Sequence, residues 1–129
     1  MSELCPCGSS KHYSKCCGRF LDQGQSAKTP EQLMRSRYSA YALGGYGNYL
    51  YNTWHSSTRN SLSPEILNES EHEWVALEVI YKSQKGNEGV IEFKAQYLLS
   101  ADKLSHLHER SSFVRESGQW FYVSGDIYE

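Results

Sequence analysis

The chain has 129 residues, of which 39% are hydrophobic and 13% are aromatic. This length and composition allow one ordinary domain with a real core, and they exclude both a disordered chain and a second large core. Lys and Arg (13) nearly balance Asp and Glu (15), and the net charge of −2 argues against nucleic-acid binding by bulk electrostatics. No apolar stretch is long enough for a signal peptide or a membrane span, so we expect a cytoplasmic protein.

All four cysteines lie close to the start of the chain, as Cys5, Cys7, Cys16 and Cys17. Four soft thiolates in two close pairs favour tetrahedral zinc, and they stand in a segment too short to build a core of its own. Four thiolates leave no open coordination position for a substrate. The predicted cofactor is therefore structural zinc.

Two disulfides are the main alternative, and a redox dithiol or another thiophilic metal also fits the spacing. The adjacent Cys16 and Cys17 would have to reach back to Cys5 and Cys7 in a strained arrangement. Disulfides also rarely persist in a reducing cytoplasm. Zinc remains the predicted state for these reasons.

Basic residues surround the cysteines: Lys11, Lys15 and Arg19, with Tyr13 among them. One interpretation is electrostatic, because these cations would offset the negative charge of a zinc tetrathiolate. The other is a surface on which Lys11, Tyr13, Lys15 and Arg19 contact a protein partner. Nucleic acid is a weaker candidate, because three or four phosphate contacts give low affinity that fades with salt.

After a polar linker at 21–28, the sequence predicts a run of helices. Thr29 can cap the first helix, Pro30 suits its first position, and Gln32 can complete a capping box. Two glycines then end it, and apolar residues at helical spacing predict two shorter helical pieces. The predicted helical segments are 29–43, 46–54 and 63–67.

From residue 74 the hydrophobic pattern changes to period two, which predicts strands joined by hairpins. Gly86-Asn87 and Ser117-Gly118 suit tight turns. Helices followed by an antiparallel meander predict an α+β fold whose helices cover one face of a curved sheet. The predicted strands are 73–82, 89–99, 104–116 and 119–127.

The cysteine segment resembles the SEC-C motif, best known at the C-terminus of SecA, the motor of bacterial preprotein translocation. The residues that carry the resemblance are Cys-Pro-Cys-Gly-Ser at 5–9, then Lys11, Tyr13, Lys15, Cys16, Cys17 and Gly18. Ser10 and His12 depart from the motif, but neither departure removes a ligand. The resemblance implies contact with a protein partner.

The remainder of the chain resembles the YchJ-like family of uncharacterised bacterial proteins. The matching segments are LMRSRYSAY at 33–41, TWH at 53–55, HERS at 108–111 and WFY at 120–122. The resemblance implies a cystatin-like cone of the nuclear-transport-factor-two (NTF2) type, with a pocket between helices and sheet. The expected division is a zinc knuckle at 1–20, a linker at 21–28 and a cone at 29–129, and we expect knuckle and cone to fold independently.

Alternation in the third strand puts one carboxylate, Glu109, on the face predicted to line the pocket. The residues predicted to share that face are Leu107, Glu109, Ser111 and Phe113. A buried carboxylate needs a partner, and Arg35 or Arg37, with Tyr38 or Tyr41, can supply one. The simpler interpretation is an internal ion pair that holds helix to sheet.

The catalytic interpretation makes Glu109 a general base in the cavity, with His55, Arg35 and a tyrosine hydroxyl such as Tyr38 converging on it. His55 has a simpler explanation, since an imidazolium is favoured at a helix C-terminus. The pair His106 and His108 projects from the opposite strand face, where we expect a solvated surface rather than a metal or phosphate site.

The predicted function is a zinc-binding adaptor or binding protein, whose knuckle contacts a protein partner and whose cone is a scaffold or a pocket for a small molecule. The alternatives are a small lyase or isomerase acting in the cone cavity and a weak nucleic-acid binder. Binding is favoured over catalysis because no complete catalytic constellation follows from the sequence. Pairing of two copies through the exposed sheet face is also compatible with a cone.

Overall fold

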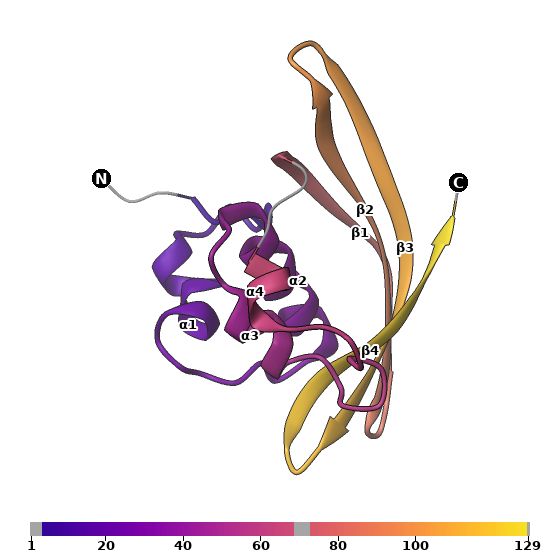
Figure 1. Ribbon diagram of the computed structural model, residues 1–129. Helices are drawn as coiled ribbons and strands as arrows, with labels where there is room; N and C mark the ends of the chain where they lie inside the picture. Colours follow the sequence, from indigo (N-terminus) through magenta and orange to yellow (C-terminus); the bar gives the residue numbers. More distant parts are fainter. Residues whose placement is uncertain (1–3, 69–72, 129) are drawn as a thin grey trace.

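The computed structural model describes residues 4–68 and 73–128, and its elements follow the predicted order. The helical elements are η1 (Tyr13–Lys15), α1 (Gly18–Leu21), α2 (Pro30–Leu43), α3 (Gly47–Asn52) and α4 (Pro64–Asn68). The strands are β1 (Glu73–Lys85), β2 (Glu88–Ser100), β3 (Lys103–Glu116) and β4 (Gln119–Tyr128). Figure 1 shows the helices gathered on one side of a long curved sheet, which confirms the predicted α+β fold. In the described part of the chain, every helix is too short or too polar to cross a bilayer.

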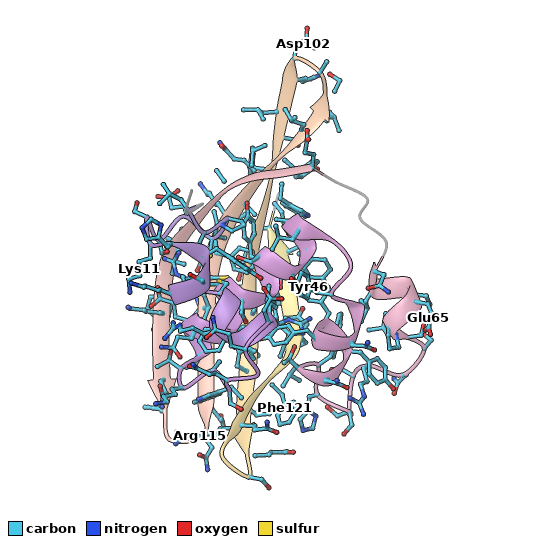
Figure 2. The ribbon with its side chains drawn as sticks, turned by 90° about the vertical axis from the view of Figure 1, so that its left-hand side faces the viewer. Lys11, Tyr46, Glu65, Asp102, Arg115 and Phe121 are labelled. Atoms are coloured by element: carbon cyan, nitrogen blue, oxygen red, sulfur yellow. The ribbon has the colours of Figure 1, made fainter. Side chains whose placement is uncertain are left out.

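The four strands form one antiparallel sheet in the order β1-β2-β3-β4. Gly86 and Gly118 occupy two of its turns with φ of 59° and 80°, a backbone region that glycine enters without strain. The β2–β3 hairpin, with Asp102 at its tip, extends beyond the helices (Figures 1 and 2). The helices therefore cover only part of the inner face of the sheet.

Helix α2 lies between the cysteine segment and the sheet (Figure 1). Thr29 Oγ1 accepts a hydrogen bond from the Gln32 N–H at 3.1 Å, as expected for the N-cap. Gln32 Oε1 accepts from the Lys28 N–H at 2.8 Å, one residue earlier than a capping box would have it. Gly44, with φ of 76°, is the C-cap, so the predicted helix bounds are confirmed.

The cysteine knuckle packs on the cone and shares its core. All four cysteines belong to the same buried cluster as Phe113 and Trp120 of the sheet. The segment predicted as a linker is also held, since Ala27 is buried and Trp120 Nε1 donates to the Lys28 carbonyl at 3.3 Å. This packing argues against independent folding of knuckle and cone. The division into a knuckle at 1–20, a linker at 21–28 and a cone at 29–129 stays a prediction. Residues 1–3 of that knuckle and residues 69–72 and 129 of that cone lie outside the described residues.

Candidate functional site

The four cysteine sulfurs converge on one point. All four side chains are buried, and their sulfur atoms lie within 4.8 Å of one another. Local structure brings them together, because the Cys5 N–H donates to the Lys11 carbonyl at 2.8 Å and Gly8 turns the chain with φ of 82°. Four sulfurs about 2.3 Å from a zinc ion stand roughly 3.8 Å apart, so this cluster fits a tetrahedral metal site.

Hydroxyl and guanidinium groups surround the sulfurs. Ser9 Oγ lies 3.2 Å from Cys16 Sγ, and Ser39 Oγ of helix α2 lies 3.7 Å from Cys5 Sγ. Arg35 Nη1 donates to the Cys7 carbonyl at 2.8 Å. Such neighbours hold metal ligands in place and offset the charge of thiolates.

The thiols of this cluster are not equivalent. Hydrogen bonding from Cys17 lowers the pKa of the Cys7 thiol to about 4, while the same interaction and burial raise the pKa of Cys17. The cluster therefore favours one thiolate even before a cation is considered, and a thiolate is the form that binds metal. The cysteines form no disulfide.

The four residues predicted to contact a partner divide into two pairs. The Tyr13 hydroxyl donates to Asp22 Oδ2 at 2.7 Å, and Arg19 Nε donates to the Cys16 carbonyl at 2.9 Å, so both stabilise the knuckle itself. Lys11 and Lys15 are exposed, and Lys11 lies at the outer edge of the knuckle in Figure 2. Of the four residues predicted to contact a partner, Lys11 and Lys15 are the exposed ones.

A cavity of about 290 Å³ lies between helix α2 and the sheet, as the cone resemblance implied. Its walls are mostly aromatic and aliphatic, with a few polar groups contributed by α2, β3 and β4. The inward face of β3 lines it as alternation predicted. The lining residues are Met34, Arg37, Tyr38, Tyr41, Trp54, Trp74, Phe93, Ala95, Leu107, Glu109, Ser111, Phe113 and Tyr122.

Arg37 is the cation of this cavity and is only 6% exposed. Its Nη1 donates to the Leu50 carbonyl at 2.8 Å and to Thr53 Oγ1 at 2.7 Å, and its guanidinium carbon lies 5.0 Å from the Trp54 ring and 4.8 Å from the Tyr122 ring. Burial lowers its pKa, because a charge is poorly solvated there. Within the described residues it forms no ion pair with a carboxylate.

Glu109 lines the same cavity from strand β3. Its Oε2 accepts from Ser111 Oγ at 2.5 Å and from the Tyr122 hydroxyl at 3.3 Å. Gly125 makes room for this carboxylate, because a Cβ at that position would overlap Glu109 Oε2. Tyr122 thus joins the two charges, with its ring against Arg37 and its hydroxyl on Glu109.

The predicted ion pair between Glu109 and an arginine is wrong in the described structure. Arg35 points away from the cavity, to Cys7 and to Glu31 Oε2 at 3.0 Å. Arg37 lines the cavity, but Glu109 takes its hydrogen bonds from hydroxyls. Two neutral hydroxyl donors bind Oε2 of the carboxylate, where the prediction had a cation.

The predicted catalytic constellation is only partly assembled. Tyr38 and Glu109 line the cavity, whereas Arg35 and His55 are not among its lining residues. His55 Nε2 lies 2.8 Å from Glu116 Oε2 at the end of β3, and its Nδ1 lies 2.7 Å from Ser57 Oγ in the loop after α3. Burial raises the pKa of Tyr38 to about 12, so its hydroxyl stays protonated and can only donate or share a proton at neutral pH.

The outer face of the sheet carries its own polar network. Glu92 lies 2.6 Å from His108 Nε2 through one oxygen and accepts from Arg110 Nη1 at 3.2 Å through the other. His106 is exposed. Cross-strand pairing of this kind is common on a solvated sheet face.

Sequence reasoning missed the aromatic partners of Arg37. Trp54 and Tyr122 are 68 positions apart in the numbering, and they meet through a bridge that pairs them and a ring contact of 5.0 Å. The segments that carry the family resemblance, TWH and WFY, contain both residues. The aromatic side chains in both segments were the sequence signal from which these partners of Arg37 could have been predicted.

Comparisons with known proteins agree with this geometry. Residues 29–125 match the family described as YchJ, middle NTF2-like domain, and residues 1–19 match the SEC-C motif. A UPF0225 protein from Chromobacterium violaceum is 46% identical, covering 94% of this chain and 90% of that protein. A UPF0225 protein from Vibrio vulnificus is 43% identical, covering 100% of this chain and 78% of that protein.

A solved structure has the same fold. The solution structure of a SEC-C motif containing protein from Rhodopseudomonas palustris matches with a TM-score of 0.87 at 35% identity, covering 98% of this chain and 100% of that one. The chain therefore belongs to the YchJ-like UPF0225 family and carries a SEC-C motif ahead of an NTF2-like domain.

Proposed function

We propose that this protein is a zinc-stabilised binding protein whose cone cavity takes a small ligand. The observation that carries the proposal is the cavity of about 290 Å³, which combines aromatic walls with a buried cation, Arg37, that forms no ion pair among the described residues. Natural ligand sites have this composition, a mostly apolar lining with a few fixed polar groups. Catalysis has less support, because Arg35 and His55 lie outside the lining.

In this proposal Cys5, Cys7, Cys16 and Cys17 hold one zinc ion that builds shape and takes no part in chemistry. The compact sulfur cluster and the match to the SEC-C motif support metal binding. Zinc is the metal that four buried thiolates favour, and four of them close its coordination sphere. Reduced cysteines suit a cytoplasmic location.

Native mass spectrometry, combined with elemental analysis, tests both parts of the proposal. We expect one zinc per chain and a further small-molecule mass that mild collisional activation releases. A filling variant, Leu107→Trp, should lose the small molecule and keep the zinc. Its control is Leu104→Trp on the exposed part of the same strand, which should keep both. Retention of the small molecule by Leu107→Trp would place it outside the cavity.

Protein contact through the knuckle is a second candidate function. Lys11 and Lys15 are exposed, and the structure shows no ion pair for either of them among the described residues. We expect Lys11→Glu with Lys15→Glu to abolish cross-linking of the knuckle to a partner in cells, while Lys103→Glu on the far hairpin leaves it unchanged. Equal cross-linking by the Lys11→Glu, Lys15→Glu variant and the Lys103→Glu variant would exclude protein contact through the knuckle. Nucleic-acid binding that is lost near physiological salt would not count as an alternative function of this surface.

A further inference from the structure

The charge on Arg37 is incompletely satisfied, and this points to the kind of ligand. Nη1 donates to the Leu50 carbonyl and to Thr53 Oγ1, which are both neutral, and the further hydrogen-bond neighbour of the guanidinium among the described residues, the Tyr41 hydroxyl, is neutral as well. Aromatic rings contact the guanidinium as well. A buried guanidinium gains most from a planar anion, which it can bind through two parallel N–H donors.

Glu109 is incomplete in the opposite sense. Its Oε2 accepts two hydrogen bonds, while Oε1 accepts none from the described residues. No buried polar atom of the described residues is left wholly without a partner, so Oε1 is open to the cavity or to solvent. An ionised carboxylate only accepts hydrogen bonds, and Oε1 therefore calls for a donor such as a hydroxyl or an amino group.

The spacing of the two groups is set by Tyr122. Its ring centroid is 4.8 Å from the Arg37 guanidinium carbon, and its hydroxyl is 3.3 Å from Glu109 Oε2. A ligand lying alongside Tyr122 would therefore reach Arg37 with one end and Glu109 with the other, about one aromatic ring apart. The volume of about 290 Å³ is at the lower end for ligand pockets, which restricts the ligand to a compact one.

The remaining walls favour a flat ring. Tyr38 and Trp74 meet edge to face at 6.1 Å, and Phe113 and Tyr122 do so at 5.8 Å, which leaves ring faces and edges along the cavity. Aromatic pairs prefer such offset and edge-to-face arrangements, and a bound ring can join them.

We propose that the cavity binds a compact aromatic acid, with its carboxylate at Arg37 and a hydroxyl or amino group, one ring away, at Glu109. This inference rests on the proposed function, since it names the ligand class of the same cavity. The carboxylate supplies the anion that Arg37 lacks, and the donor completes Glu109 Oε1. The ring replaces water against the aromatic walls.

Titration calorimetry on the full chain with its metal bound tests the inference, with 4-hydroxybenzoate as the probe. Its uncharged counterpart 4-hydroxybenzamide has nearly the same shape, so the comparison isolates the charge without any substitution. Benzoate lacks the donor. We expect the acid to bind about ten-fold or more tightly than the amide, and benzoate to bind more weakly than 4-hydroxybenzoate.

Variants assign the binding to the proposed groups. Arg37→Met should make the affinities for 4-hydroxybenzoate and 4-hydroxybenzamide equal. Glu109→Gln should reduce the difference in affinity between 4-hydroxybenzoate and benzoate. Leu107→Trp should abolish binding, while Leu104→Trp preserves it. If Arg37→Met does not fold, the comparison of acid with amide on the unmodified chain still decides the question.

Equal binding of acid and amide, blocked by Leu107→Trp, would overturn the aromatic-acid inference but leave the cavity as a binding site. Acid binding that Leu107→Trp does not change would overturn the inference as well, because the acid would then sit elsewhere. Failure of every probe to bind would also overturn it, and the small-molecule mass in native spectrometry would then decide separately whether the cavity binds anything.

Discussion

The cysteine cluster and the cone cavity lie on opposite sides of helix α2, and they differ in how completely the chain satisfies their polar groups. Around the sulfurs, Ser9, Ser39 and Arg35 supply hydrogen bonds from the protein itself. In the cavity, Arg37 forms no ion pair with a carboxylate of the described residues, and one oxygen of Glu109 accepts no hydrogen bond from them. A buried polar set completed by its own chain supports stability, whereas polar groups that line a cavity with hydrogen-bonding capacity to spare are typical of a binding site.

The largest effect should come from breaking the sulfur cluster. We expect Cys17→Ser to lose the proposed metal and to lower the free energy of unfolding by more than about 3 kcal/mol, because the four cysteines are part of the common core. Thermal unfolding followed by circular dichroism and tryptophan fluorescence should show knuckle and cone losing stability together. A cone that melts unchanged would restore the expectation of independent folding. Lys11→Ser, at an exposed position of the same segment, is the control.

A smaller effect is expected where the backbone of Gly125 lies close to the Glu109 carboxylate. Gly125→Ala places a Cβ against Glu109 Oε2 and should cost about 1–3 kcal/mol in urea unfolding. In a Glu109→Ala background the same substitution should cost much less, because the overlapping group is gone. An equal loss of unfolding free energy in both backgrounds would show that the overlap with Glu109 is not the cause. Ser124→Ala, at the neighbouring exposed position, is the control.

Arg35 distinguishes the two sides of helix α2. Removing its hydrogen bond to the Cys7 carbonyl with Arg35→Met should weaken zinc binding about ten-fold, measured by competition with a chelator. Ligand binding in the cavity should stay the same, since Arg35 is not among the lining residues. If Arg35→Met changed the affinity of the cavity for its ligand and left the affinity for zinc unaltered, Arg35 would belong to the cavity and not to the cysteine cluster.

The smallest effect concerns acid stability. The hydrogen bond from Lys82, together with Arg35, holds the pKa of Glu31 below its ordinary value of 4.5. The folded-state pKa is depressed, so this contribution to stability is present above about pH 4.5 and is lost as the pH falls below it. The pair is near the surface, and we expect less than about 1 kcal/mol. Unfolding of Glu31→Gln and the unmodified chain at pH 7 and pH 4 should show a difference that shrinks in acid; a constant difference would exclude the ionic contribution.

Local signals in the sequence were enough to predict the elements and the cysteine cluster. Thr29, Pro30 and Gly44 define the ends of α2 through caps, and the two-residue periodicity defines the strands. The four cysteines lie so near one another along the chain that their convergence needs no distant contact. These features depend on a few neighbouring residues, which is why they can be read without the fold.

The cavity chemistry depended on information that the sequence does not carry locally. Arg35 and Arg37 are two residues apart, so on a helix they point about 200° apart, and only the rotation of α2 decides which one faces the sheet. The donors to Glu109 are hydroxyls in place of the expected arginine: Ser111 lies two residues along the same strand, and the pairing of β3 with β4 brings in Tyr122. His55 finds Glu116 across 61 positions, a contact that no local pattern predicts.

Helix α2 contributes Ser39 and Arg35 to the surroundings of the sulfurs and Arg37 and Tyr38 to the cavity. The two sites therefore share one rigid body, and a small displacement of that helix is felt by both. Thermodynamic reciprocity then applies. If a ligand in the cavity favours one position of the helix and so changes the affinity of the sulfurs for metal by some factor, then bound metal changes the affinity of the cavity for that ligand by the same factor. Through the shared helix, a metal on the sulfurs and a ligand in the cavity would then be partners in a single linked equilibrium.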